Sequence, residues 1–150
     1  MSSFKLRLAL PTSVVFEGDV IQVGLPGSEG YLTILPDHEA MVGVLRPGII
    51  KALTVDREAF NFFVRDGFMD ISSKEVLVSG TKAIPESEIT HNFVFSELRG
   101  ARISLDNAVT DVDRLVSSNT LIDLYTVLCK YVVAEEAECD RFLNMDYFDF

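Results

Sequence analysis

The tripeptide Asp37-His38-Glu39 combines three side chain types that could bind a metal ion or exchange protons. Neighbouring side chains on an extended segment point to opposite faces, so three consecutive residues converge poorly on one ion. The tripeptide follows Pro36, which favours a polar loop. No H-E-x-x-H or G-x-S-x-G sequence accompanies it, and no nucleophile has an evident partner. We therefore predict no catalytic residue, no metal ligand and no cofactor-binding residue.

Three glycines, Gly24, Gly27 and Gly30, follow a G-x-x-G-x-x-G spacing rather than the dinucleotide-binding G-x-G-x-x-G pattern. The dinucleotide motif also requires a helix directly after its glycines, whereas residues 31–35 are typical of a strand. The glycines are therefore predicted to serve turns.

The composition excludes several classes of function. Thirteen Lys and Arg against 23 Asp and Glu give a net charge of −10, which would repel nucleic acid and anionic lipid. No apolar run approaches the ~18 residues of a membrane-spanning helix, and the N-terminus does not resemble a signal peptide. Cys129 and Cys139 would lie about 15 Å apart on a helix, so we predict reduced thiols rather than a disulfide within the chain.

Residues 1–85 have the pattern of an all-β domain. Residues 4–10 alternate between apolar and other side chains, as in a half-buried strand. Asp66-Gly67, between two apolar runs, predicts a hairpin turn because such turns need a positive φ. Short strands separated by turn signals predict a sandwich or barrel. The further apolar runs occupy residues 20–23, 49–55, 60–64, 68–71 and 76–78.

Residues 86–150 change to the helical period. Two stripes of apolar residues predict two amphipathic helices, and the short link between them predicts an antiparallel hairpin. Asp111 or Asp113 could cap the second helix. Neither helix can bury its stripe alone, so the pair needs a surface to pack on. The first stripe contains Val94, Leu98, Ala101, Leu105, Ala108 and Val112, and the second Leu121, Leu124, Leu128 and Tyr131.

Several motifs, in order and at matching spacing, resemble the ε subunit of bacterial F-type ATP synthases. The family's P-G-x-x-G turn, its L-P-x-H and L-x-P-G segments, and its F-V-x-x-G-F segment match residues 26–30, 35–38, 45–48 and 63–68, and F-x-G matches residues 16–18. Residues 110–114 lie where that family joins its two helices.

The resemblance implies a β-sandwich of about ten strands followed by the helical hairpin. It implies a non-catalytic rotor subunit, without a cofactor, at the cytoplasmic face of the bacterial inner membrane. Its sandwich would contact the γ subunit and the c-ring, and its hairpin could reach the α and β subunits. No direct membrane insertion is expected. The residues expected to contact partners are Tyr31, Pro36, Asp37, His38, Leu45 and Pro47.

The hairpin departs from the family in charge. Family members can use basic hairpin residues to meet an acidic segment of the β subunit and inhibit ATP hydrolysis. Residues 117–150 contain seven acidic side chains and only Lys130 and Arg141 as basic ones. We therefore predict weak or absent inhibition. Residues 97–102 resemble the family's nucleotide-binding segment only in part, so ATP binding is not predicted.

Two other classes of protein remain as alternatives. A free-standing ligand-binding β-sandwich, such as a carbohydrate module, would need exposed aromatic residues, and the chain contains no Trp. A small hydrolase built on Asp37-His38-Glu39 would need a nucleophile with a partner. Retention on a γ subunit distinguishes the rotor hypothesis from both.

Overall fold

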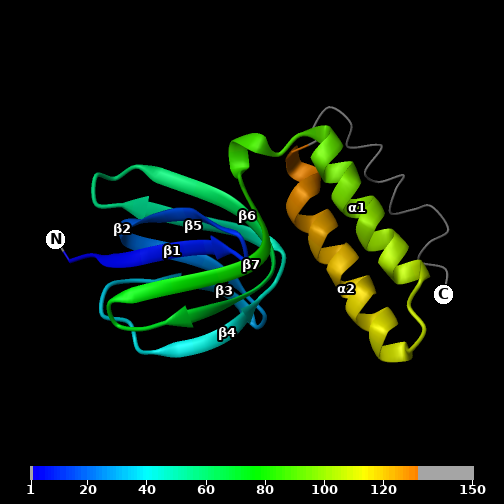
Figure 1. Ribbon diagram of the computed structural model, residues 1–150, viewed down its shortest axis with the longest axis horizontal. Coiled ribbons are helices and arrows are strands. Elements are labelled where there is room, and N and C mark those ends of the chain that lie inside the picture. The colour runs from blue at the N-terminus through cyan, green and yellow to red at the C-terminus, as the bar shows by residue number, and fades with distance from the viewer. Residues whose placement is uncertain (1, 132–150) are drawn as a thin grey trace. The chain divides into compact units, whose positions relative to one another are not determined.

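The computed structural model describes residues 2–131 of the 150-residue chain. The chain divides into two compact units between Glu88 and Ile89. The first unit is built of strands, and the described part of the second is helical (Figure 1). The boundary predicted at residue 85 lies a few residues before this division.

The first unit is a β-sandwich, as predicted, but its described residues form seven strands rather than about ten. The resemblance implied more strands, whereas here β2, β6 and β7 are 15, 13 and 11 residues long and continue without interruption. The strands are β1 (Phe4–Leu10), β2 (Ser13–Gly27), β3 (Gly30–Ile34), β4 (Met41–Leu45), β5 (Gly48–Thr54), β6 (Ala59–Ile71) and β7 (Glu75–Pro85), and a short 3-10 helix, η1 (Glu86–Glu88), follows them.

The sheet closes on itself because its long strands change partners. The strand order is β1-β7-β6-β4-β2-β3, β5 pairs with β2 and β6, and β1 also pairs with β2. The pairing of β1 with β7 is parallel, whereas the other pairings are antiparallel. Because β1 is held on both sides, neither of its edges is open, which removes a template for aggregation.

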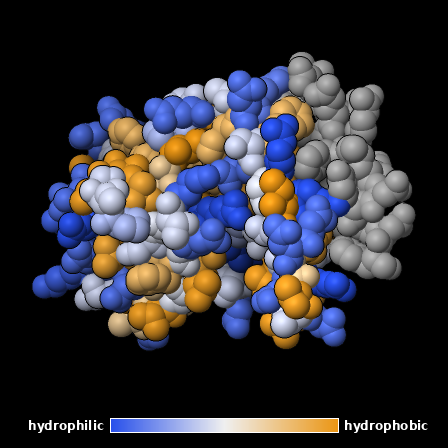
Figure 2. All heavy atoms as spheres, turned by 45° about the vertical axis from the view of Figure 1, so that its right-hand side comes forward, coloured by the Kyte–Doolittle hydropathy of each residue, from blue (hydrophilic) through white to orange (hydrophobic). Residues whose placement is uncertain are grey.

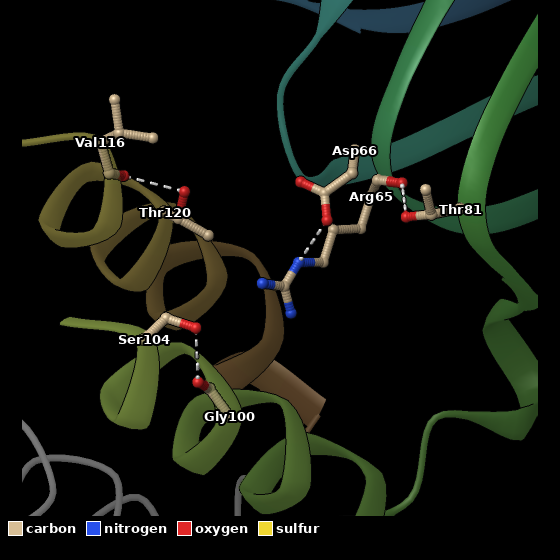
Figure 3. Close-up of polar contacts among 7 residues, drawn as sticks. All are labelled: Arg65, Asp66, Thr81, Gly100, Ser104, Val116 and Thr120. Carbon is tan, nitrogen blue, oxygen red and sulfur yellow. Dashed lines mark hydrogen bonds and ion pairs between the residues drawn. The ribbon is translucent and has the colours of Figure 1, made fainter. Parts of the chain in front are cut away.

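The strand β6 changes partner at Asp66-Gly67, where the sequence predicted a hairpin. Residues 59–64 pair with β5, and residues 67–71 pair with β4. The register with β7 is the same on both sides of Asp66, so the chain bends here without reversing. Asp66 has a φ of 54°, and the Thr81 hydroxyl donates to the Arg65 carbonyl at 3.3 Å beside the bend (Figure 3). The hairpin prediction was therefore wrong: the positive φ serves a bend within one strand.

The sandwich core is aliphatic for the most part and lies between the two layers of the sheet. Alternate residues of each strand point inward, as the period-two pattern predicted. Leu6 and Leu8 of β1, for example, are at most 1% exposed. The other members of this core are Phe4, Val20, Val23, Leu25, Ile34, Leu45, Ile50, Ala52, Phe62, Val64, Met69, Ile71, Val76, Val78 and Ala83.

The second unit contains α1 (His91–Asp106) and α2 (Asp111–Leu128), followed by the 3-10 helix η2 (Cys129–Tyr131). The two α-helices lie side by side and are joined by a short link, which makes them an antiparallel hairpin (Figure 1). Each begins at a threonine cap: the Thr90 hydroxyl accepts a hydrogen bond from the Phe93 amide, and the Thr110 hydroxyl accepts one from the Asp113 amide. Thr110, rather than Asp111 or Asp113, is therefore the cap of α2.

The first helix is shorter than its predicted stripe. Val94, Leu98, Ala101 and Leu105 are buried, as expected, but α1 ends at Asp106. Val112 belongs to α2 and is 70% exposed. The stripe extended too far because its spacing of three and four residues continues by chance across the link.

The second helix is packed unevenly along its length. Its buried residues, Leu121, Leu124 and Leu128, all lie in its second half. Residues 111–120 contain no buried side chain, and three apolar residues among them, Val112, Leu115 and Val116, are between 58% and 70% exposed. Apolar side chains accordingly interrupt the hydrophilic surface of the molecule (Figure 2). The helix nevertheless continues, and its Thr120 hydroxyl donates to the Val116 carbonyl at 3.0 Å (Figure 3).

Candidate functional site

Two of the segments that resemble family motifs, the turns at residues 27–30 and 45–48, are joined by hydrogen bonds. The Ser28 amide donates to the Val44 carbonyl at 2.9 Å, and the Arg46 amide donates to the Pro26 carbonyl at 2.8 Å. Gly27 also pairs with Leu45 in the ladder between β2 and β4. The sequence placed these turns 18 residues apart, and the sheet brings them together at one end of the sandwich.

Glycines allow this close approach. A Cβ atom on Gly48 would lie 2.6 Å from the Pro26 Cβ, and one on Gly27 would lie 2.8 Å from the Gly30 carbonyl oxygen. Gly30 itself has a φ of +136°, which only glycine adopts readily. Gly27 and Gly30 thus serve the turn, as predicted, whereas Gly24 lies within β2, where it pairs with Thr33 and Lys51, and serves no turn.

Tyr31 is the first large side chain after the turn at residues 27–30. It pairs with Pro26 across the strands, and its hydroxyl group lies over Gly24, where a Cβ atom would collide with it. The side chain is 53% exposed overall. Partial burial nevertheless raises the pKa of its hydroxyl above the ordinary value of 10.0. Tyr31 thus presents an uncharged aromatic side chain at this end of the sandwich. Part of that side chain packs over Gly24 and the rest is exposed.

Pro36, Asp37 and His38 lie in the loop between β3 and β4, at the opposite end of β3 from Tyr31. The five residues of β3 separate the two groups by roughly 13–17 Å. Asp37 is exposed with a φ of 64°, and His38 Nδ1 lies 2.7 Å from the Glu39 carbonyl oxygen. The structure therefore brings Tyr31 and Pro47 to one end and the loop residues to the other, rather than all into one site.

Leu45 differs from the other predicted contact residues because its side chain is only 4% exposed and belongs to the sandwich core. It can support the turn at residues 45–48 from beneath, but it offers no side chain surface to a partner in this structure. Pro36, His38 and Pro47 are half-buried.

Val42, Val44 and Phe68 are exposed apolar residues that were not predicted as contacts from the sequence. They are 76%, 60% and 56% exposed. The sequence did contain a signal for this exposed apolar surface. Residues 41–45 include no polar side chain, whereas a strand with one solvated face normally alternates apolar and polar residues.

Among residues 2–131, no three His, Cys, Asp or Glu side chains gather closely enough to hold a metal ion. No helix in the same part of the chain is long and apolar enough to cross a membrane.

Residues 3–86 match the family model of the ATP synthase delta/epsilon chain β-sandwich domain. The chain belongs to this ATP synthase family. The match covers nearly the whole first unit, including both joined turns and the loop that contains His38. The family resemblance expected from the motifs is therefore confirmed.

Curated relatives named ATP synthase epsilon chain extend the similarity beyond the sandwich. The chain from Jannaschia sp. (strain CCS1) is 32% identical over 111 residues, which cover 74% of this chain and 83% of the relative. The chain from Brucella anthropi is 28% identical over 125 residues, which cover 83% of this chain and 93% of the relative.

Solved structures share the fold at lower identity. A chain of the Euglena gracilis mitochondrial ATP synthase matches with a TM-score of 0.64 and 19% identity, over 93% of this chain and 82% of the other. A chain from the central stalk and c-ring structure of the Tetrahymena thermophila mitochondrial enzyme matches with a TM-score of 0.59 and 14% identity, over 83% and 96%.

Proposed function

We propose that this chain is a non-catalytic subunit of the central stalk of a bacterial F-type ATP synthase, where it joins the γ subunit to the c-ring. The observation that carries the proposal is the family match over residues 3–86, followed by a helical hairpin as in the family. The chain would work as a peripheral subunit at the cytoplasmic face of the inner membrane. Its hairpin would be the part that can reach the α and β subunits.

The mechanical construction of the sandwich suits this role. A subunit that transmits rotation must not deform between the two surfaces that contact its partners. The ring of paired strands, with β1 held between β2 and β7, resists shear because every strand shift would break hydrogen bonds along its length. The joined turns at residues 27–30 and 45–48 extend this stiffness to one end of the sandwich.

We assign partner contacts to five of the six predicted residues. Tyr31 and Pro47 would contact one partner surface at the end with the joined turns. Pro36, Asp37 and His38 would contact a surface at the other end of β3. Because the Tyr31 side chain is 53% exposed, its contact at this end would be aromatic.

Nucleotide binding by the hairpin is not part of the proposed function. The Arg102 guanidinium is held by Asp106 through Nε at 3.1 Å and Nη2 at 3.0 Å, and the Arg102 side chain is only 9% exposed. Recruiting this guanidinium for a phosphate would require breaking a two-point ion pair and exposing the arginine.

Copurification tests the proposal. The full-length chain carrying a removable tag is expressed in its source organism, and the complex is isolated in mild detergent. We expect γ and the c-ring to be recovered with it in stoichiometric amounts. Recovery of the chain without γ would contradict the proposal, and binding of a sugar or other small ligand instead would favour a free-standing module.

His38→Ala and Tyr31→Ala test the assigned contacts in the same complex, with Glu58→Ala as control. Glu58 is an exposed residue between β5 and β6 and is not one of the assigned contacts. We expect each test variant to lower the yield of c-ring or γ and the control to leave it unchanged. Equal yields for all three variants would show that these side chains are not contacts.

A further inference from the structure

The chain that joins the sandwich to the helical hairpin is short. The last strand, β7, ends at Pro85, and η1 (Glu86–Glu88) and two further residues, Ile89 and Thr90, lead to α1 (Figure 1). Thr90 is already the cap of α1, and its carbonyl accepts a hydrogen bond from the Val94 amide at 3.0 Å. The direction of the hairpin is therefore decided by the few residues between the end of β7 and this cap.

The strand ladder and apolar packing do little to hold η1. The ladder between β6 and β7 ends where Phe62 pairs with Pro85, and proline has no amide hydrogen to donate. The 3-10 helix η1 contains no buried side chain. A cavity of about 540 Å³ also borders it, which leaves part of the adjoining surface unfilled. The cavity is lined by Val15, Phe16, Ala59, Phe60, Asn61, Phe62, Pro85, Glu86 and Ser87.

A side-chain hydrogen bond holds η1 one residue beyond the end of the ladder. The Asn61 Nδ2 atom of β6 donates to Glu86 Oε2 at 2.7 Å. The acceptor is a carboxylate, and hydrogen bonds to charged groups are stronger than those between neutral groups. The bond is partly buried, so water competes less for its two partners. We call this hydrogen bond the linker latch.

The Asn61 side of the linker latch is fixed by the sandwich. Asn61 pairs with Lys51 of β5, and the next residue, Phe62, is 6% exposed and belongs to the sandwich core. The Phe62 ring centroid lies 5.7 Å from that of Phe16, which packs against the same core. Because Asn61 is anchored in this way, loss of the hydrogen bond would release Glu86 rather than β6.

We infer that Asn61 is a positioning residue for the helical hairpin, an assignment that rests on the proposed function, in which the hairpin reaches the α and β subunits. With the linker latch closed, the chain is held through η1 and changes direction only at Ile89 and Thr90. With the latch open, the chain is free from Glu86 onward. Asn61 thereby sets the point about which the hairpin moves.

The linker latch also sets how far the start of α1 can move from the sandwich. An extended chain spans at most about 3.5 Å per residue. Residues 89 and 90 alone give the start of α1 a reach on the order of 7 Å from the end of η1. Residues 86–90 together would give about 17 Å from the end of β7. A closed latch therefore keeps the hairpin near the end of β7.

Distance measurements by double electron–electron resonance on the full-length chain test the inference. One spin label is attached at Ser73→Cys in the sandwich and the other at Ser96→Cys in α1, both at exposed positions. Cys129 and Cys139 are replaced by serine so that only these two positions react. We expect Asn61→Ala to widen the distribution of distances between the labels by up to about 10 Å, which is the additional reach.

Matched variants separate the linker latch from general destabilisation. Glu86→Ala should widen the distribution as Asn61→Ala does, and the double variant should widen it no further, because both substitutions remove one shared bond. Glu88→Ala is the control, since Glu88 is an exposed residue of the same 3-10 helix. Hydrogen exchange at residues 86–90 should accelerate about tenfold in Asn61→Ala but not in the control. Thermal unfolding verifies that each variant is folded.

The outcomes distinguish the inference from the proposed function. If Asn61→Ala and Glu86→Ala leave the distance distribution unchanged, the bond does not position the hairpin and the inference fails. If Glu88→Ala widens the distribution as much as they do, η1 is held by another contact and the inference also fails. These distances are measured without γ, so a failure of γ to copurify would overturn the proposed function and leave the linker latch in place.

Discussion

At the scale of single residues, Gly67 shows how one residue type can be required for a reason other than backbone conformation. The sequence suggested that Gly67 supplies the positive φ of a hairpin turn. In the structure the positive φ belongs to Asp66, and a Cβ atom on Gly67 would collide with the Ser79 carbonyl oxygen of β7. Glycine is needed here because two backbones touch.

Gly67→Ala is therefore expected to destabilise the sandwich by about 1–3 kcal/mol, because β7 must shift to admit the methyl group. Gly100→Ala is the matched control, since a Cβ atom there would have no heavy atom within 4 Å. Alanine at this position within α1 should stabilise the helix by about 0.5–1 kcal/mol. Urea unfolding followed by circular dichroism measures both, and equal stability of Gly67→Ala and the unmodified chain would contradict the contact.

At the scale of elements, the helical hairpin was predictable in kind but not in its boundaries. Apolar spacing indicated both helices, but the period could not show that the four residues between Asp106 and Asp111 leave the helix. Thr110 caps α2 through one local hydrogen bond, and Asp111 and Asp113 were competing candidates for the same role. Sequence alone does not choose between the three residues because Thr and Asp both cap helices well.

Thr110→Ala is expected to destabilise α2 by about 1 kcal/mol, because the Asp113 amide loses its acceptor. Asp111→Asn should cost less, about 0.3–1 kcal/mol, since only its interaction with the helix dipole changes. Hydrogen exchange of the amides at residues 113–120 measures the effect, because this half of α2 contains no buried side chain to compensate. A larger effect from Asp111→Asn would show that the charge of Asp111 stabilises this end of α2 more than the Thr110 cap does.

The strands were predictable where one face is buried and one is polar, as in residues 4–10. The strands were not predictable where tertiary contacts determine how far a strand continues. The long strand β6 passes a strong turn signal because β7 pairs with it on both sides of Asp66. The sequence also indicated the turns of the candidate site, but only the sheet register shows that two of them touch and that the loop with His38 lies elsewhere.

At the scale of the whole molecule, the charge of the hairpin predicts weak or absent inhibition of ATP hydrolysis. The chain carries −10 in total, and residues 117–150 contribute seven acidic side chains and two basic ones. An acidic hairpin would meet the acidic segment of a β subunit with repulsion rather than attraction.

Truncation after Glu88 tests this charge argument. We expect the ATPase rate of the soluble complex with the truncated chain to equal that with the full-length chain, because there is little inhibition to remove. The recovered complex must contain the truncated chain in stoichiometric amount, which serves as the control. A several-fold rise in hydrolysis on truncation would show that the hairpin inhibits despite its charge.

The parallel pairing of β1 with β7 has a consequence for how the protein is made. Lys5 pairs with Glu75 and Ala9 with Ser79, about seventy residues later in the chain. The N-terminal strand therefore leaves the ribosome early but keeps one edge bare until the last strand of its unit emerges. Such distant pairings slow folding and leave exposed strand edges to be protected during translation. The sandwich becomes ready for assembly only when its final strand is released.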